Sequence, residues 1–226
     1  MQIKIKEPRL VKQFRAIKYQ LKKFSNALPE GSVAYVAGGA LRDFHHGWGV
    51  RDVDIFYYIP NDKLAMHYDP TVDQQVYSHL SHFSNLKLLG QGENGYDYDE
   101  HQGIQDIYEH QIHKGELKYN PLQLIRVKSH PLSVIQDFPI NMSRIWMGID
   151  GVIQTCESYD YGYENSIMRE MHRKQYNYLY LAKIMGRFSD YAFYPLTYFS
   201  NQKRLQREAT EEAIKDSDAT NVVKLY

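Results

Sequence analysis

Two aspartates that share one face of a predicted strand are the residues of this sequence best suited to chemistry. Asp52 and Asp54 are separated by Val53 and precede an apolar run. Successive side chains of a strand alternate between its faces, so both carboxylates point the same way, with Cα atoms roughly 6.5 to 7 Å apart. Neighbouring anions repel each other and call for a compensating cation. We therefore expect the pair to bind Mg²⁺ or Mn²⁺ for phosphoryl-transfer chemistry, although an Asp-x-Asp strand taken alone is more often simply exposed.

A glycine turn lies about a dozen residues before the aspartate pair. Gly38 and Gly39 follow the short apolar run at 33–37 and open a predicted short helix. Glycine allows the backbone to turn sharply and to approach a ligand closely, and the start of a helix directs N–H groups at phosphate. A nucleoside triphosphate with its metal needs both an anion-binding turn and cation-binding carboxylates. The combination is more specific than either half.

The stretch GGALRDFHHGWGVRDVDI at 38–55 resembles the signature of the polymerase-β-type nucleotidyltransferases. It is most similar to the catalytic head domain of class II poly(A) polymerases and tRNA CCA-adding enzymes. The resemblance implies that Gly38 and Gly39 bind the triphosphate and that the aspartate pair binds the metal. It also implies that Arg42 supports the phosphates, whereas Asp43 holds the loop or meets the sugar.

A second stretch, VIQDFPINMSRIWMGIDGVI at 134–153, is similar to the family's RRDFTINA segment and the strand after it. Asp137 and Asn141 match, but Ile135 and Gln136 replace the arginine pair of the family. Asp137 is a candidate third carboxylate near the metal, or else a turn residue that caps backbone N–H groups. Asn141 either reads the nucleotide or satisfies a buried turn.

The third acidic residue of the broader superfamily has no counterpart on the strand PLQLIRV, which carries Gln123 at that place. Either Asp137 takes this role, or the site works with two carboxylates, or catalysis is impaired. Arg51 adjoins the pair and either offsets transition-state charge or forms an ion pair. Arg173 lies in a predicted helix and either grips the triphosphate or faces solvent.

Composition limits the partners of the whole chain. The 226 residues carry 27 Lys and Arg against 27 Asp and Glu, so a nucleic-acid-binding surface must be local rather than global. The basic face of a helix predicted over residues 8–27 is one such surface, or is merely solvated. The single cysteine, Cys156, cannot form an internal disulfide, and no apolar run reaches the roughly 20 residues of a membrane span. We expect a cytoplasmic protein with no membrane partner.

The remaining patterns predict an α+β nucleotidyltransferase fold, a small mixed sheet flanked by helices. A catalytic domain is expected over 1–160 and a helical C-terminal segment over 161–226. Helices are expected at 72–83, 164–188 and 199–216. A loop is expected at 90–103, a hairpin at 104–112 and 117–127, and two strands around GIDG.

The predicted reaction moves a nucleoside monophosphate from an NTP, ATP or CTP, to an acceptor hydroxyl and releases pyrophosphate. By resemblance the acceptor is an RNA 3′ end, tRNA above all. The alternatives are a protein or small-molecule acceptor, or a non-catalytic nucleotide- or RNA-binding module on the same fold. With its abbreviated tail, the chain resembles a minimal nucleotidyltransferase of the kind found in phages and toxin systems.

Overall fold

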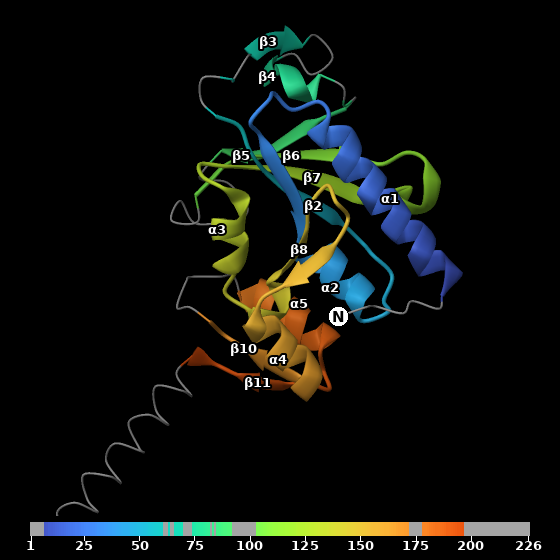
Figure 1. Ribbon diagram of the computed structural model, residues 1–226, viewed down its shortest axis with the longest axis vertical. Helices are drawn as coiled ribbons and strands as arrows, with labels where there is room; N and C mark the ends of the chain where they lie inside the picture. Colours follow the sequence, from blue (N-terminus) through green and yellow to red (C-terminus); the bar gives the residue numbers. More distant parts are fainter. Residues whose placement is uncertain are drawn as a thin grey trace, which may run out of the picture.

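A seven-stranded mixed β-sheet forms the centre of the computed structural model, which describes residues 7–60, 63, 66–69, 74–81, 83, 85–91, 103–171 and 178–196 (Figure 1). The strand order is β5-β6-β7-β2-β1-β8-β9. Their bounds are β1 (Val33–Ala37), β2 (Val53–Tyr58), β5 (Lys87–Gln91), β6 (Ile104–Gln111), β7 (Pro121–Val127), β8 (Ile145–Met147) and β9 (Ile153–Thr155). The mixed sheet with its flanking helices confirms the predicted α+β class.

The central strand β2 carries the aspartate pair. It runs antiparallel to β1 and parallel to β7, and every other neighbouring pair of the sheet is antiparallel. Val53, Ile55 and Phe56 are at most 1% exposed, because β2 is covered on both faces. The expected hairpin of β6 with β7 and the two strands around GIDG are confirmed.

Helices cover the sheet on opposite faces (Figure 1). On one face lie α1 (Pro8–Ser25) and α2 (Gly39–His45), and on the other lies α3 (Pro131–Gln136). The predicted N-terminal helix is confirmed, because apolar side chains at helical spacing give α1 a continuous stripe toward the sheet. The buried apolar residues of this stripe are Leu10, Ile17, Leu21 and Phe24.

The C-terminal part departs from the expected helix at 164–188. It contains α4 (Glu157–Asn165), β10 (Ile167–Arg169), α5 (Tyr178–Arg187) and β11 (Ala192–Tyr194). Ser166 ends α4 in the left-handed conformation, with φ 53°, and β10 then pairs in parallel with β11. A pairing between segments about 25 residues apart in the chain overrides the local helical pattern.

The predicted helix at 72–83 is also wrong. Residues 74–77 form β4 (Gln74–Tyr77), which pairs with β3 (Met66–Asp69), and η2 (Ser78–Leu80), a short 3₁₀ helix, follows. Leu80 and Phe83 do reach the core, at 0% and 3% exposure, so the apolar spacing marked the buried positions while strand pairing set the conformation. Most of the loop predicted at 90–103 and the whole helix predicted at 199–216 lie outside the described residues. Among the described residues, no helix is both long and apolar enough to cross a bilayer.

Candidate active site

A glycine conformation joins β1 to α2. Gly38 has φ 72° and ψ −126°, a backbone region that other residues adopt only with strain. Its N–H donates to the carbonyl of Ile145 in β8 at 3.0 Å, and the ring of Phe138 lies 3.7 Å from the place a Cβ would take. The chain can therefore turn from strand to helix in one residue at this position.

The same turn lies against the aspartate pair. Asp54 is opposite Ala37, the last residue of β1, so Asp52 lies beside the start of α2. A Cβ added to Gly39 would be 3.5 Å from Oδ1 of Asp52 and 3.7 Å from Nη2 of Arg42. The structure thus brings together the glycine turn, Arg42 and the two carboxylates, four features that the sequence motif had predicted for one site.

The electrostatics of the pair favour an added cation. Burial, and then the neighbouring charge of Asp52, raise the pKa of Asp54 to about 8. Two cations oppose this shift, first Lys183 and then Arg42. The Nζ atom of Lys183, on α5, lies 4.0 Å from Oδ2 of Asp52, whose side chain is 34% exposed. The described cations only partly compensate the pair, and a divalent metal ion would complete the compensation.

The neighbour of Asp54 on the other side is an amide. Gln123 of β7 is in parallel register with Asp54, so the residue beside Asp54 on this strand is a glutamine and not an acid. Asp137 follows α3 as its C-terminal cap, and its N–H donates to the carbonyl of Val134 at 3.2 Å. Within the described part of the chain, no three His, Cys, Asp or Glu side chains are grouped closely enough to hold a metal. The catalytic role of Asp137 stays a prediction.

Asp43 is a buried centre of ion pairs. At 1% exposure, its Oδ1 accepts hydrogen bonds from Nε and Nη2 of Arg42, both at 3.2 Å. Arg187 of α5 donates to both of its oxygens, at 3.0 Å and 2.6 Å. Of the two roles predicted for Asp43, this geometry favours holding the loop, because its oxygens are engaged by two arginines. Arg187 was missed at the sequence level, where no spacing relates it to the motif.

Asn141 is fully enclosed and uses its whole amide. Its Nδ2 donates to the carbonyls of Ser158 and Ile167 at 3.0 and 3.2 Å, and its Oδ1 accepts from the N–H of Arg169 at 2.7 Å. These bonds tie the 3₁₀ turn η5 (Asn141–Ser143) to α4 and β10. The contacts favour the buried-turn alternative over contact with a nucleotide.

A further buried arginine adjoins the glycine turn. Arg144 is 9% exposed, its Nε donates to the carbonyl of Phe138 at 2.9 Å, and among the described residues its Nη2 has no hydrogen-bond partner. Burial lowers its pKa. Of the other predicted basic residues, Arg51 is exposed just ahead of the pair, and Arg173 lies outside the described residues.

Two histidines after the turn attach the C-terminal part of the chain. The ring of His45 stacks on Tyr159 and Tyr163, and its Nδ1 lies 2.7 Å from the Tyr159 hydroxyl. Nε2 of His46 lies 3.0 Å from the hydroxyl of Tyr191. Burial lowers the pKa of His45 to about 4, so this ring is uncharged at neutral pH. These contacts, with Arg187 and Lys183, bring α5 to the predicted site.

No family model matches the sequence, and no curated protein is significantly similar to it. Solved structures with a similar fold include the Thermotoga maritima CCA-adding enzyme complexed with tRNA, at a TM-score of 0.52 and 15% identity over 94% of this chain and 47% of that one. An apo CCA-adding enzyme has a TM-score of 0.49 and 11% identity, covering 95% and 45% of the two chains. The Bacillus stearothermophilus CCA-adding enzyme with CTP has a TM-score of 0.40 and 20% identity, over 73% of this chain and 34% of that one.

The chain spans less than half the length of these solved structures. At such low identity the likeness concerns the fold alone, and the Thermotoga structure is the one whose score supports an argument. Taken with the glycine turn and the Asp-x-Asp strand, it shows that this chain has a nucleotidyltransferase fold resembling the head domain of the CCA-adding enzymes.

Proposed function

We propose that the protein is a metal-dependent nucleotidyltransferase that moves a nucleoside monophosphate from an NTP to the 3′ hydroxyl of an RNA, tRNA above all, and releases pyrophosphate. The observation that carries the proposal is the closeness of the glycine turn to the two carboxylates that could bind a metal. A Cβ added to Gly39 would lie 3.5 Å from Oδ1 of Asp52. A triphosphate on the turn would have its phosphates within reach of a metal on the pair.

Asp52 and Asp54 would hold Mg²⁺ or Mn²⁺, because their oxygens are hard ligands on one strand face. The metal, when bound, neutralises phosphate charge and lowers the pKa of an attacking hydroxyl. Two carboxylates leave room in an octahedral shell for waters and phosphate oxygens. The chain's own contribution is positioning and charge, supplied by the turn and its cations.

Three cations lie close to the glycine turn or to the aspartate pair. Arg42 lies beside Gly39, Lys183 beside Asp52, and Arg144 beside the residue that binds the Gly38 N–H. We infer that Arg144 and Lys183 provide positive charge that the motif's missing arginine pair would otherwise supply. Arg51 and Arg173, proposed for the same ligand, would add to this charge.

The test is transfer of label from each α-labelled NTP, with Mg²⁺, to total RNA and to total cell protein. The variants are Asp52→Asn and Asp54→Asn, and Glu30→Gln is a matched control because it removes one exposed carboxylate before β1, at the opposite end from the pair. We expect label on small RNA that falls at least 100-fold in both aspartate variants and is unchanged in the control.

Other outcomes separate the remaining candidates. Label on protein or on a small molecule would keep the chemistry and replace the acceptor. NTP binding without any transfer would favour the non-catalytic module, a reading that Gln123 beside Asp54 supports. Undiminished transfer by both aspartate variants would refute the assignment of the site.

A further inference from the structure

The outward face of α1 has an unusual composition. Besides Pro8 and Arg9 in its first turn, five positions of the helix are exposed, and four of these five are basic. The five positions are Lys12, Arg15, Tyr19, Lys22 and Lys23. Their spacings of three, four and seven residues place them on one side of a helix, opposite the apolar stripe. The whole helix contains no Asp or Glu, although the chain as a whole carries equal numbers of acidic and basic residues.

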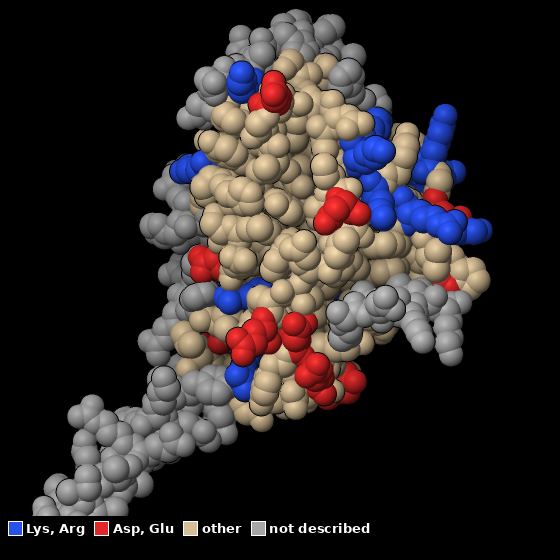
Figure 2. Space-filling model, in the orientation of Figure 1, with Lys and Arg blue, Asp and Glu red and all other residues tan. Residues whose placement is uncertain are grey.

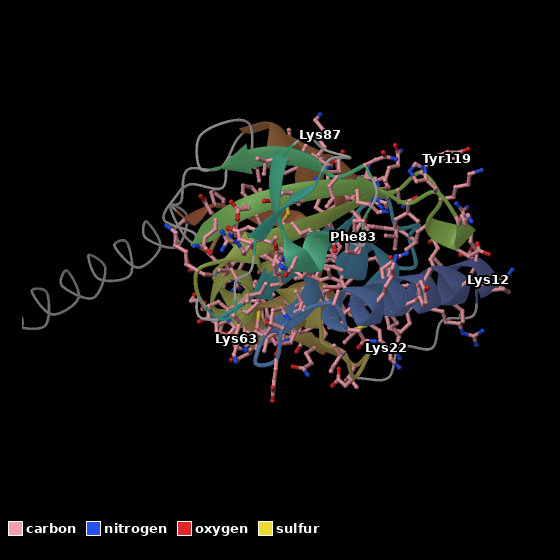
Figure 3. The ribbon with its side chains drawn as sticks, turned by 90° about the horizontal axis from the view of Figure 1, so that it is seen from above. Lys12, Lys22, Lys63, Phe83, Lys87 and Tyr119 are labelled. Atoms are coloured by element: carbon pink, nitrogen blue, oxygen red, sulfur yellow. The ribbon has the colours of Figure 1, made fainter. Side chains whose placement is uncertain are left out.

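Little of this positive charge is neutralised by the protein itself. Among the described residues, only Lys12 of this face forms a salt bridge, at 3.7 Å to Glu116 and largely exposed. Figure 2 shows Lys and Arg side chains gathered on the side of the molecule where Figure 1 places α1. In Figure 3, Lys12 and Lys22 project from α1 at different points along its length. The face is therefore a local positive surface on a neutral protein.

An exposed aromatic ring occupies the middle of this surface. Tyr19 is 65% exposed, with Arg15 one turn before it and Lys22 and Lys23 one turn after it. Basic side chains that follow a phosphate backbone, interleaved with aromatic rings on which bases stack, are the features of RNA-binding surfaces. A membrane surface fits less well, because insertion requires an apolar face, and the apolar face of α1 is packed in the core.

The buried side of the same helix contacts the segment that leads to the proposed active site. Oε1 of Gln13, a residue that is only 3% exposed, accepts a hydrogen bond from the N–H of Val50 at 3.3 Å. Val50 precedes the exposed Arg51 and then Asp52. The contact places α1 next to the segment that leads to the carboxylates. We propose that the outer face of α1 binds the RNA acceptor of the reaction proposed above, on which this inference rests.

The test compares two triple variants that remove the same charge. Lys12→Gln/Arg15→Gln/Lys22→Gln removes three of the four positive charges of the face, and Lys63→Gln/Lys87→Gln/Lys128→Gln neutralises three exposed lysines elsewhere. Binding of a fluorescent tRNA transcript is measured from 0.05 to 0.5 M salt. We expect the first variant to bind about 100-fold more weakly at 0.15 M salt, with a salt slope shallower by about 2 to 3. The control should lose less than about 5-fold.

Tyr19→Ala tests stacking apart from charge, and we expect at least about 5-fold weaker binding of a single-stranded oligoribonucleotide. Equal losses in the two triple variants, or no loss in either, would overturn the inference. Phosphatidylserine vesicles that compete with the RNA are the second probe. The inference would also be overturned if binding of these vesicles were weakened by the α1 triple variant as much as binding of the RNA is. NTP binding without RNA reports on the aspartate pair separately: if RNA binding depends on α1 but no label is transferred, the surface stands and the proposed reaction fails.

Discussion

Replacement of Asp54 by Asn should stabilise the metal-free protein, and increasingly so as the pH rises. The pKa of Asp54 is raised to about 8 by burial and by Asp52, whereas an aspartate of the unfolded chain titrates near 3.9. Between these values the native state binds more protons than the unfolded state. The free energy of unfolding of the wild type therefore falls from about pH 4 to about pH 8, and a neutral amide removes that loss.

The size of the effect follows from the surroundings of the pair. One pKa unit corresponds to about 1.4 kcal/mol, so the three pH units from 5 to 8 set an upper limit of roughly 4 kcal/mol. Asp52 is 34% exposed, so solvent screens the repulsion between the two carboxylates. We expect Asp54→Asn to gain about 1 to 2 kcal/mol relative to wild type over this pH range.

Urea unfolding at pH 5, 6, 7 and 8 with a chelator measures this difference directly. Glu30→Gln serves as the control and should stay within about 0.5 kcal/mol of wild type throughout. With Mg²⁺ at 100 times its dissociation constant, the wild type should gain about 2.7 kcal/mol and Asp54→Asn much less. If the difference in free energy of unfolding between Asp54→Asn and wild type did not change with pH, the account of a buried Asp54 repelled by Asp52 would be refuted. Destabilisation by Asp54→Asn at pH 8 without metal would refute it as well.

Three further substitutions test the supports of the site. Gly38→Ala should lower the free energy of unfolding by about 1 to 3 kcal/mol, measured by urea unfolding, because its φ of 72° strains any residue with a Cβ. Gly162→Ala should cost about 3 kcal/mol or more in the same assay, because its Cβ would meet the Ile167 carbonyl and the Asn141 amide, and a loss below about 1 kcal/mol would contradict this packing. Lys183→Met should move the onset of Mn²⁺ binding to higher pH in a titration, because Lys183 lowers the pKa of Asp54; an unchanged onset would show that the lysine does not act on the pair.

The elements around the catalytic motif could be predicted because their signals are local. Alternation along β2 places both carboxylates on one face, and only glycine tolerates the turn at Gly38. The helix α1 follows from apolar spacing with a period that no strand shares. Each of these conclusions depends on neighbours within a few residues of the chain.

Where long-range pairing competes with local pattern, the sequence misled. In the segment at 164–188 the helical spacing correctly predicts α5, yet the earlier part forms β10, which pairs with β11. The segment at 72–83 likewise has helical spacing, yet β4 pairs with β3. Hydrogen bonds to a distant strand outweigh intrinsic propensities of a few tenths of a kcal/mol per residue.

The sequence by itself determined the glycine turn, the Asp-x-Asp strand and the glutamine at the third position, since motif and alternation need no knowledge of distant contacts. Only the tertiary structure decided which cations reach them. Lys183 and Arg187 come from α5, more than 120 residues beyond the motif, and arrive at Asp52 and Asp43 because the chain folds back. The same folding placed Asn141 in a buried turn. Charge interactions depend on distance in space, which residue spacing does not specify beyond the local element.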